Sequence, residues 1–297
     1  MSPRDLGPGL AGLPRPLALV VGGGGCLGAA HVGVGLALEA HGFRPDLVVG
    51  TSAGALNGAL VAAHPGEAAP WLRNVWTQME RRRVLGVPRP WQAGGVFPTD
   101  GLRRLIDRAG LPARVEELPV PFRAVATDVV TGEEVVMGDG DLVTALLASA
   151  AVPGVLPPVE RDGRLLVDGG VVAYVPVLAA LRAGAASIVA LSSGPESWPM
   201  RPTAPRRRAA AVAARAGLFA LHHQIERDLW QVAASVPTVV LPTGVEAWPS
   251  PWDFSQADRL ITTARDAAER FLQETAISAA PGLYRVPGYG PPPPGAP

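Results

Sequence analysis

Ser52 stands between Gly50 and Gly54 in the pattern Gly-x-Ser-x-Gly. The short apolar run 47–50 precedes the serine, and small, helix-compatible residues follow it. This order is typical of a nucleophile elbow, in which a strand turns sharply into a helix and exposes a serine hydroxyl. Side chains two positions before and after the serine would collide in that turn, which explains a glycine at each place. The pattern therefore predicts a nucleophilic serine at the N-terminus of a helix, where backbone amides stabilise an anion.

A second candidate for chemistry is a glycine-rich loop between a predicted strand, 17–21, and a predicted helix, 28–41. It fits Gly-x-Gly-x-x-Gly through four glycines: Gly23, Gly24, Gly25 and Gly28. One interpretation is a dinucleotide site, but that needs an acidic residue at the end of the second strand, and Asp46 precedes this strand. The other is an oxyanion hole, since a right-handed βαβ crossover brings both strand ends to one edge, where the glycine amides can face Ser52.

A serine nucleophile needs a proton acceptor within hydrogen-bond reach. The five histidines all fall within or at the end of predicted helices, rather than in a loop beyond a strand: His31, His41, His64, His222 and His223. Asp168 instead ends a short predicted strand and is followed by Gly169 and Gly170. A carboxyl group has a pKa of about 3.9 in water, so Asp168 would need burial beside Ser52 to act as a base.

Together, the glycine loop, the Gly-x-Ser-x-Gly pattern and Asp168-Gly-Gly resemble the patatin-like phospholipases. The similarity includes the segment 148–158 and Asp253-Phe-Ser, and it covers about residues 15 to 275. The resemblance implies a three-layer α/β/α fold with a central, mostly parallel sheet. It also implies a lipid acyl hydrolase that uses a Ser–Asp dyad without metal or cofactor. Ser52 would be the nucleophile and Asp168 the proton acceptor, with the amides of Gly23 to Gly25 and Ala53 forming the oxyanion hole.

Two positions depart from the pattern of that family, which usually has Arg or Lys at the position of Leu27 and commonly Asn at that of Tyr174. A leucine removes a cation beside the glycine loop, and no basic residue nearby in the sequence replaces it, although Arg123 or Arg161 could fold into the gap. We therefore expect a preference for neutral or short-chain acyl esters over anionic phospholipids. Neither departure touches the dyad.

The chain has 26 basic and 26 acidic residues among 297, so its overall charge does not favour nucleic acid. Its hydrophobic content of 48% excludes general disorder. A single cysteine, Cys26, excludes an intramolecular disulfide framework. We see neither a secretory signal nor a transmembrane run, so the expectation is a soluble cytoplasmic protein that contacts an acyl-ester or lipid substrate, with transient contact to a membrane or micelle surface left open. No feature indicates an oligomeric state.

Apolar runs of four to six residues alternate with helical patterns, which predicts an α/β fold with helices flanking a parallel sheet. We expect one catalytic domain over residues 16–276, between Pro- and Gly-rich disordered tails at 1–15 and 277–297. Two other functions remain as alternatives, a nucleotide-binding module and a non-catalytic lipid-binding protein.

Large apolar residues also occur in Pro-rich irregular stretches, where core partners are fewer. We expect some of them to form an apolar surface around the active site, and packing under loops is the alternative. These residues are Trp91, Phe97, Trp198, Met200, Trp248 and Trp252.

Overall fold

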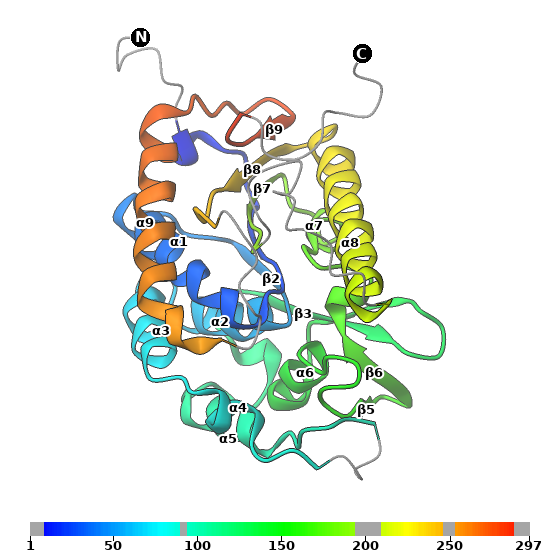
Figure 1. The fold of residues 1–297 in the computed structure, drawn as a ribbon. Helices are drawn as coiled ribbons and strands as arrows, with labels where there is room; N and C mark the ends of the chain where they lie inside the picture. Colours follow the sequence, from blue (N-terminus) through cyan, green and yellow to red (C-terminus); the bar gives the residue numbers. More distant parts are fainter. Residues whose placement is uncertain (1–8, 90–93, 194–208, 246–252, 288–297) are drawn as a thin grey trace.

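The computed structural model describes residues 9–89, 94–193, 209–245 and 253–287, which are built around one mixed sheet (Figure 1). The strand order is β5-β6-β3-β2-β1-β7-β8-β9, and β4 pairs with β3 outside this path. The parallel strands are β3 (Phe122–Asp128), β2 (Leu47–Thr51), β1 (Leu17–Val21), β7 (Ser187–Leu191), β8 (Pro237–Leu241) and β9 (Gly282–Tyr284). The antiparallel strands are β4 (Glu134–Met137), β5 (Val159–Arg161) and β6 (Arg164–Asp168).

Helices cover both faces of the sheet, because alternate residues of each central strand point to opposite sides. In β1, Leu17 and Leu19 pack in one buried cluster, whereas Ala18 and Val20 pack in the other. The first face is covered by α1 (Gly28–Ala40), α2 (Ala53–Ala63), α6 (Leu142–Ser149) and α9 (Ala257–Glu274). The second is covered by α7 (Val177–Arg182) and α8 (Ala209–Ala233), so α8 and α9 lie on opposite sides in Figure 1. This confirms the predicted three-layer, mostly parallel fold.

Three further helices extend the first layer away from the sheet. α3 (Ala68–Thr77) packs against α1 and α2, while α4 (Arg81–Leu85) packs against α5 (Asp100–Arg108). No helix in the described segments is both long enough and apolar enough to cross a membrane.

Strand β6 is one of the antiparallel strands of this mostly parallel sheet. It runs antiparallel to β3, with Asp168 opposite Ala126. The β5–β6 hairpin therefore delivers Asp168 toward the middle of β3, next to Val125, whose partner in β2 is Thr51. The antiparallel hairpin thus brings Asp168 close to the elbow. Asp168 does not end a parallel strand, unlike the residues that precede the glycine loop and Ser52.

Both expected tails contain packed residues. Near the N-terminus, Leu13 is buried in the core, and Arg15 forms an ion pair with Asp46 at 2.5 Å. Near the C-terminus, Ile277 is fully buried, and β9 pairs with β8. The high Pro and Gly content of these stretches predicted disorder and did not reveal the short apolar segments within them. At the C-terminus, the edge of β8 would be unpaired without a further strand, which favours its pairing with β9.

Of the apolar residues expected around the active site, only Phe97 lies in the described segments. It is partly buried against the core, so it follows the alternative of packing beneath a loop. Trp91, Trp198, Met200, Trp248 and Trp252 lie outside the described residues.

The packing of Ile277 predicts that this residue stabilises the fold. Ile277→Ala should lower the free energy of unfolding by about 2–4 kcal/mol, because it leaves a cavity in the core. Urea unfolding followed by circular dichroism measures this change. Val130→Ala, at an exposed turn, is the matched control and should change stability by less than about 0.5 kcal/mol. If Ile277→Ala and the native chain are equally stable, the result would instead support the expectation that Ile277 lies in a disordered tail.

Candidate active site

Ser52 joins β2 to α2 in a backbone conformation that residues other than glycine seldom adopt, with φ 56° and ψ −126°. Such a conformation costs of order 1–3 kcal/mol and persists only where neighbouring structure holds it. The Ser52 amide donates a hydrogen bond to Ser149 Oγ at 2.9 Å, and this hydroxyl donates to the carbonyl of Val125 at 2.6 Å. Ser149 is completely buried. A hydroxyl at the end of α6 therefore ties the elbow to β3.

The glycines on either side of Ser52 permit a close approach of backbone segments. A Cβ atom on Gly50 would lie 2.5 Å from the carbonyl oxygen of Gly54, and one on Gly54 would lie 2.1 Å from that of Val21. A residue with a Cβ atom does not fit at these distances without a shift of the backbone, so only glycine is accommodated. This confirms the steric interpretation of Gly-x-Ser-x-Gly, with the N-terminus of α2 packed directly on the end of β1.

The glycine loop lies beside the serine, as the pairing of parallel β1 and β2 requires. A Cβ atom built on Gly23 would be 3.6 Å from Ser52 Cβ. The Gly23 amide, however, donates to the carbonyl of Tyr174 at 2.9 Å, so it is not available for an oxyanion. Within the described part of the chain, the amides of Gly24, Gly25 and Ala53 donate no hydrogen bond. These three donors remain for an anion at Ser52.

Asp168 is 5% exposed, and Ser52 is 8% exposed. Burial raises the pKa of the Asp168 carboxyl from 3.8 to about 6, although hydrogen bonding with the Ser52 side chain and the Gly170 amide opposes this shift. Oδ1 accepts from the Gly170 amide at 2.7 Å. Oδ2 is buried and forms no hydrogen bond of ordinary geometry within the described segments. A carboxylate with one unsatisfied oxygen beside a serine hydroxyl has the position and the proton affinity of a base.

The backbone around Asp168 is fixed by three other segments. Its amide donates to Ala151, and its carbonyl accepts a hydrogen bond from Thr127 Oγ1 at 3.0 Å. A Cβ atom on the following Gly169 would lie 2.3 Å from the carbonyl oxygen of Val125. The Asp-Gly-Gly pattern thus has a steric basis, because only glycine allows the chain to turn this close to β3.

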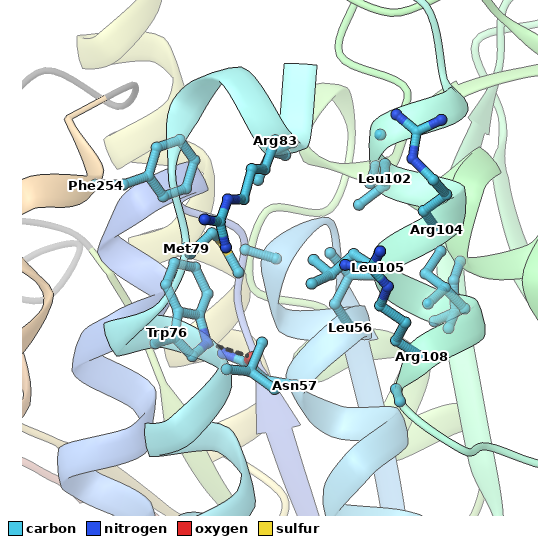
Figure 2. A pocket seen from close by; sticks show the side chains of 18 of the residues that line it. Leu56, Asn57, Trp76, Met79, Arg83, Leu102, Arg104, Leu105, Arg108 and Phe254 are labelled. Carbon is cyan, nitrogen blue, oxygen red and sulfur yellow. Dashed lines mark hydrogen bonds between the residues drawn. The ribbon is translucent and has the colours of Figure 1, made fainter. Parts of the chain in front are cut away.

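A buried polar network anchors the other end of the glycine loop. His31 Nε2 lies 2.7 Å from Ser193 Oγ, and its Nδ1 lies 3.3 Å from Asn57 Nδ2. Asn57 also donates to the carbonyl of Gly28 and accepts from Trp76 Nε1, each at 2.9 Å (Figure 2). Burial lowers the pKa of His31 to about 4, so its ring is neutral at pH 7. The sequence indicated only a helical histidine here, since its partners come from distant segments.

The remaining candidate bases do not reach the site. His222 and His223 lie on α8, which packs on the second face of the sheet, and neither lines the cavity that contains Ser52. In the described segments, no cluster of three or more His, Cys, Asp or Glu side chains is placed to hold a metal ion.

Asp46 has a structural role that excludes it from a dinucleotide site. Its carboxylate accepts from the Leu17 amide at 2.7 Å and pairs with Arg15, at the start of the strands rather than at their ends. Asp46 is therefore not placed to act as the acidic partner that a ribose would need at the glycine loop.

Ser52, Ala53 and Gly25 line a cavity of about 650 Å³ between α2, α3, α4 and α5 (Figure 2). Apolar residues form most of its wall, and they include Leu56, Leu105, Met79 and Trp76. A cavity of this size and polarity fits a hydrocarbon chain.

Three cations, Arg83, Arg104 and Arg108, also line this cavity. Leu27 is 0% exposed within the core and does not line it. Cations therefore line the cavity, although Leu27 supplies none beside the glycine loop, and the effect of Leu27 on substrate preference stays a prediction. Arg161 does not fill the gap either, since it donates to the carbonyls of Asp139 and Asp141.

Comparisons with known proteins give one consistent family. The family model for patatin-like phospholipase matches residues 19–181. An uncharacterized NTE family protein of Mycobacterium tuberculosis is 36% identical over 195 residues, which are 65% of this chain and 53% of that protein. The chain therefore spans about half the length of this relative.

Other similarities are more partial. The human patatin-like phospholipase domain-containing protein 6 is 35% identical over 186 residues, which are 60% of this chain and 13% of that protein. Among solved structures, VipD from Legionella pneumophila gives a TM-score of 0.47 at 14% identity, over 88% of this chain and 67% of that chain.

The contact between Ser149 and Ser52 predicts that Ser149 positions Ser52, the expected nucleophile. Ser149→Ala should lower stability by about 1–3 kcal/mol, because the Ser52 amide loses its partner. It should also slow the reaction of Ser52 with a fluorophosphonate probe about tenfold or more, since the elbow relaxes. Ser187→Ala is the matched control, because Ser187 is a buried serine that donates to Pro14 at the opposite end of the sheet. Equal labelling rates in the two variants would assign Ser149 a role in stability alone.

Proposed function

Because the chain belongs to the patatin-like phospholipase family, we propose that it hydrolyses acyl esters of lipids, with Ser52 as nucleophile and Asp168 as proton acceptor. The observation that supports this most directly is the conjunction of three features. Ser52 is strained, it lines an apolar cavity, and it lies beside a buried carboxyl whose pKa is about 6. A hydroxyl at its ordinary pKa is a weak nucleophile, and an adjacent base corrects this.

In the proposed reaction, Asp168 takes the proton of Ser52 Oγ as this oxygen attacks the ester carbonyl. The carbonyl oxygen becomes negative and accepts hydrogen bonds from the amides of Gly24, Gly25 and Ala53. When the tetrahedral intermediate collapses, the alcohol leaves with the proton from Asp168, and an acyl group remains on Ser52. Water then attacks this ester with Asp168 as base, which releases the fatty acid and regenerates both side chains.

Each oxyanion donor of this kind typically stabilises the transition state by about 3 kcal/mol. The positive end of the α2 dipole adds to this, because α2 begins at Ala53, directly after the nucleophile. The cavity supplies the remaining requirement by excluding water from the acyl chain.

The first test uses a fluorophosphonate probe and p-nitrophenyl butyrate. The native chain should be labelled at Ser52, and Ser52→Ala should lose labelling and hydrolysis while it keeps its circular dichroism spectrum. Asp168→Asn should lose at least about a thousandfold in kcat, because an amide cannot take the proton. The control is the double variant His222→Gln/His223→Gln, on the other face of the sheet, which should keep most of its activity. A folded protein that binds lipid vesicles but is not labelled would be a non-catalytic lipid-binding protein.

The raised pKa of Asp168 predicts the pH dependence. The base must be ionised, so kcat/KM for a neutral ester should fall tenfold per pH unit below an apparent pKa of about 6. Ionisation of this carboxyl above that pH should leave a plateau. Rates at constant ionic strength between pH 4.5 and 8 measure the profile, after a stability check at each pH. An apparent pKa near the ordinary aspartate value would contradict the assignment of Asp168.

A further inference from the structure

The wall of the cavity is strongly basic in a chain without net charge. Residues 68–111, which include α3, α4 and α5, contain eight arginines and only three acidic residues, whereas the chain has 26 of each sign. A local excess of this kind attracts anions even where the total charge is zero.

Two of these arginines are directed at the cavity. In Figure 2 the side chains of Arg83 and Arg108 point toward the space between Trp76 and Leu105, while the guanidinium of Arg104 points away from it. Arg83 and Arg108 come from different helices, α4 and α5, which pack against each other. The cavity thus has an apolar wall and two cations that approach it from separate elements.

Neither guanidinium is neutralised by a strong internal partner. Arg83 pairs with Glu80 at 3.4 Å, and because both side chains are about two-thirds exposed, at 65% and 64%, this pair contributes little. Arg108 makes no ion pair or hydrogen bond with another side chain in the described segments. Both groups are therefore available to a ligand, and a guanidinium binds phosphate oxygens in a bidentate manner.

We propose that the cavity binds a lipid whose head group has a net negative charge, such as phosphatidylglycerol, with Arg83 and Arg108 on its phosphate. The apolar wall holds the hydrocarbon chain, and the cations select anionic over zwitterionic head groups, in which a trimethylammonium group would be repelled. This inference rests on the proposed hydrolase function and reverses the preference that Leu27 suggested.

The test measures kcat/KM for phosphatidylglycerol and phosphatidylcholine with identical acyl chains, each diluted equally into neutral detergent micelles. The native chain should favour phosphatidylglycerol, and Arg83→Gln/Arg108→Gln should reduce the ratio of the two values about tenfold. Because the ratio compares two substrates on the same protein, partial loss of folded protein does not change it.

The matched control is Arg82→Gln/Arg103→Gln, which removes the same charge from the same two helices at exposed positions that do not line the cavity. This control should keep the native ratio. An equal fall in both double variants would indicate general attraction to an anionic surface and overturn the site. A native ratio of one would overturn the preference itself.

Two additional measurements separate the possible failures. Soluble glycerol 3-phosphate should inhibit at least tenfold more weakly than a short-chain phosphatidylglycerol, and equal inhibition would overturn the lipid assignment in favour of a free phosphate site. Labelling of Ser52 by the fluorophosphonate probe reports the hydrolase function by itself. If Ser52 is labelled and the head-group preference is absent, only the inference about Arg83 and Arg108 fails; without labelling, the hydrolase proposal fails.

Discussion

The site depends on one close contact, the packing of the N-terminus of α2 against the end of β1. Gly54 lies so near the carbonyl of Val21 that a methyl group there would be 2.1 Å from its oxygen. This contact places Ser52 beside the glycine loop and forces its backbone to φ 56°. The strain of about 1–3 kcal/mol is offset by the hydrogen bond to Ser149 and by the sheet around it. The position of Ser52 is thus held by close backbone packing between β1 and α2.

The buried carboxyl of Asp168 lowers the stability of the folded protein at neutral pH. Its pKa is about 6 in the folded state and 3.8 for an unperturbed aspartate, so the folded state binds the proton more tightly. The stabilisation linked to this proton is fully present below pH 3.8 and is lost as the pH rises through about 6. At neutral pH the ionised group therefore lowers the free energy of unfolding by about 3 kcal/mol relative to its protonated form. The same desolvation raises the proton affinity of the carboxyl, as the proposed role of Asp168 as a base requires.

Two sets of polar side chains near Ser52 and the cavity differ in burial and charge. The network of His31, Asn57 and Ser193 is buried, neutral and internally hydrogen-bonded, which suits a rigid support for the glycine loop. Arg83 and Arg108 are exposed and weakly paired, which suits contact with a charged ligand. In the proposed function, the first group would support the backbone next to Ser52, and the second would contact the head group of the lipid.

The sequence by itself determined the elbow, the glycine loop and Asp168, because each depends on glycines next to one functional residue, and steric requirements of this kind are local. It also indicated most strands and helices through their periodicity. Only the tertiary structure decided that β6 is antiparallel, that Leu13 and Ile277 are buried and that β9 pairs with β8. It likewise decided that Ser149 holds Ser52 across 97 positions and that Ser193 meets His31 across 162. The physical reason is that such contacts are created by packing between elements, and a pattern within one element contains no information about the partner it will meet.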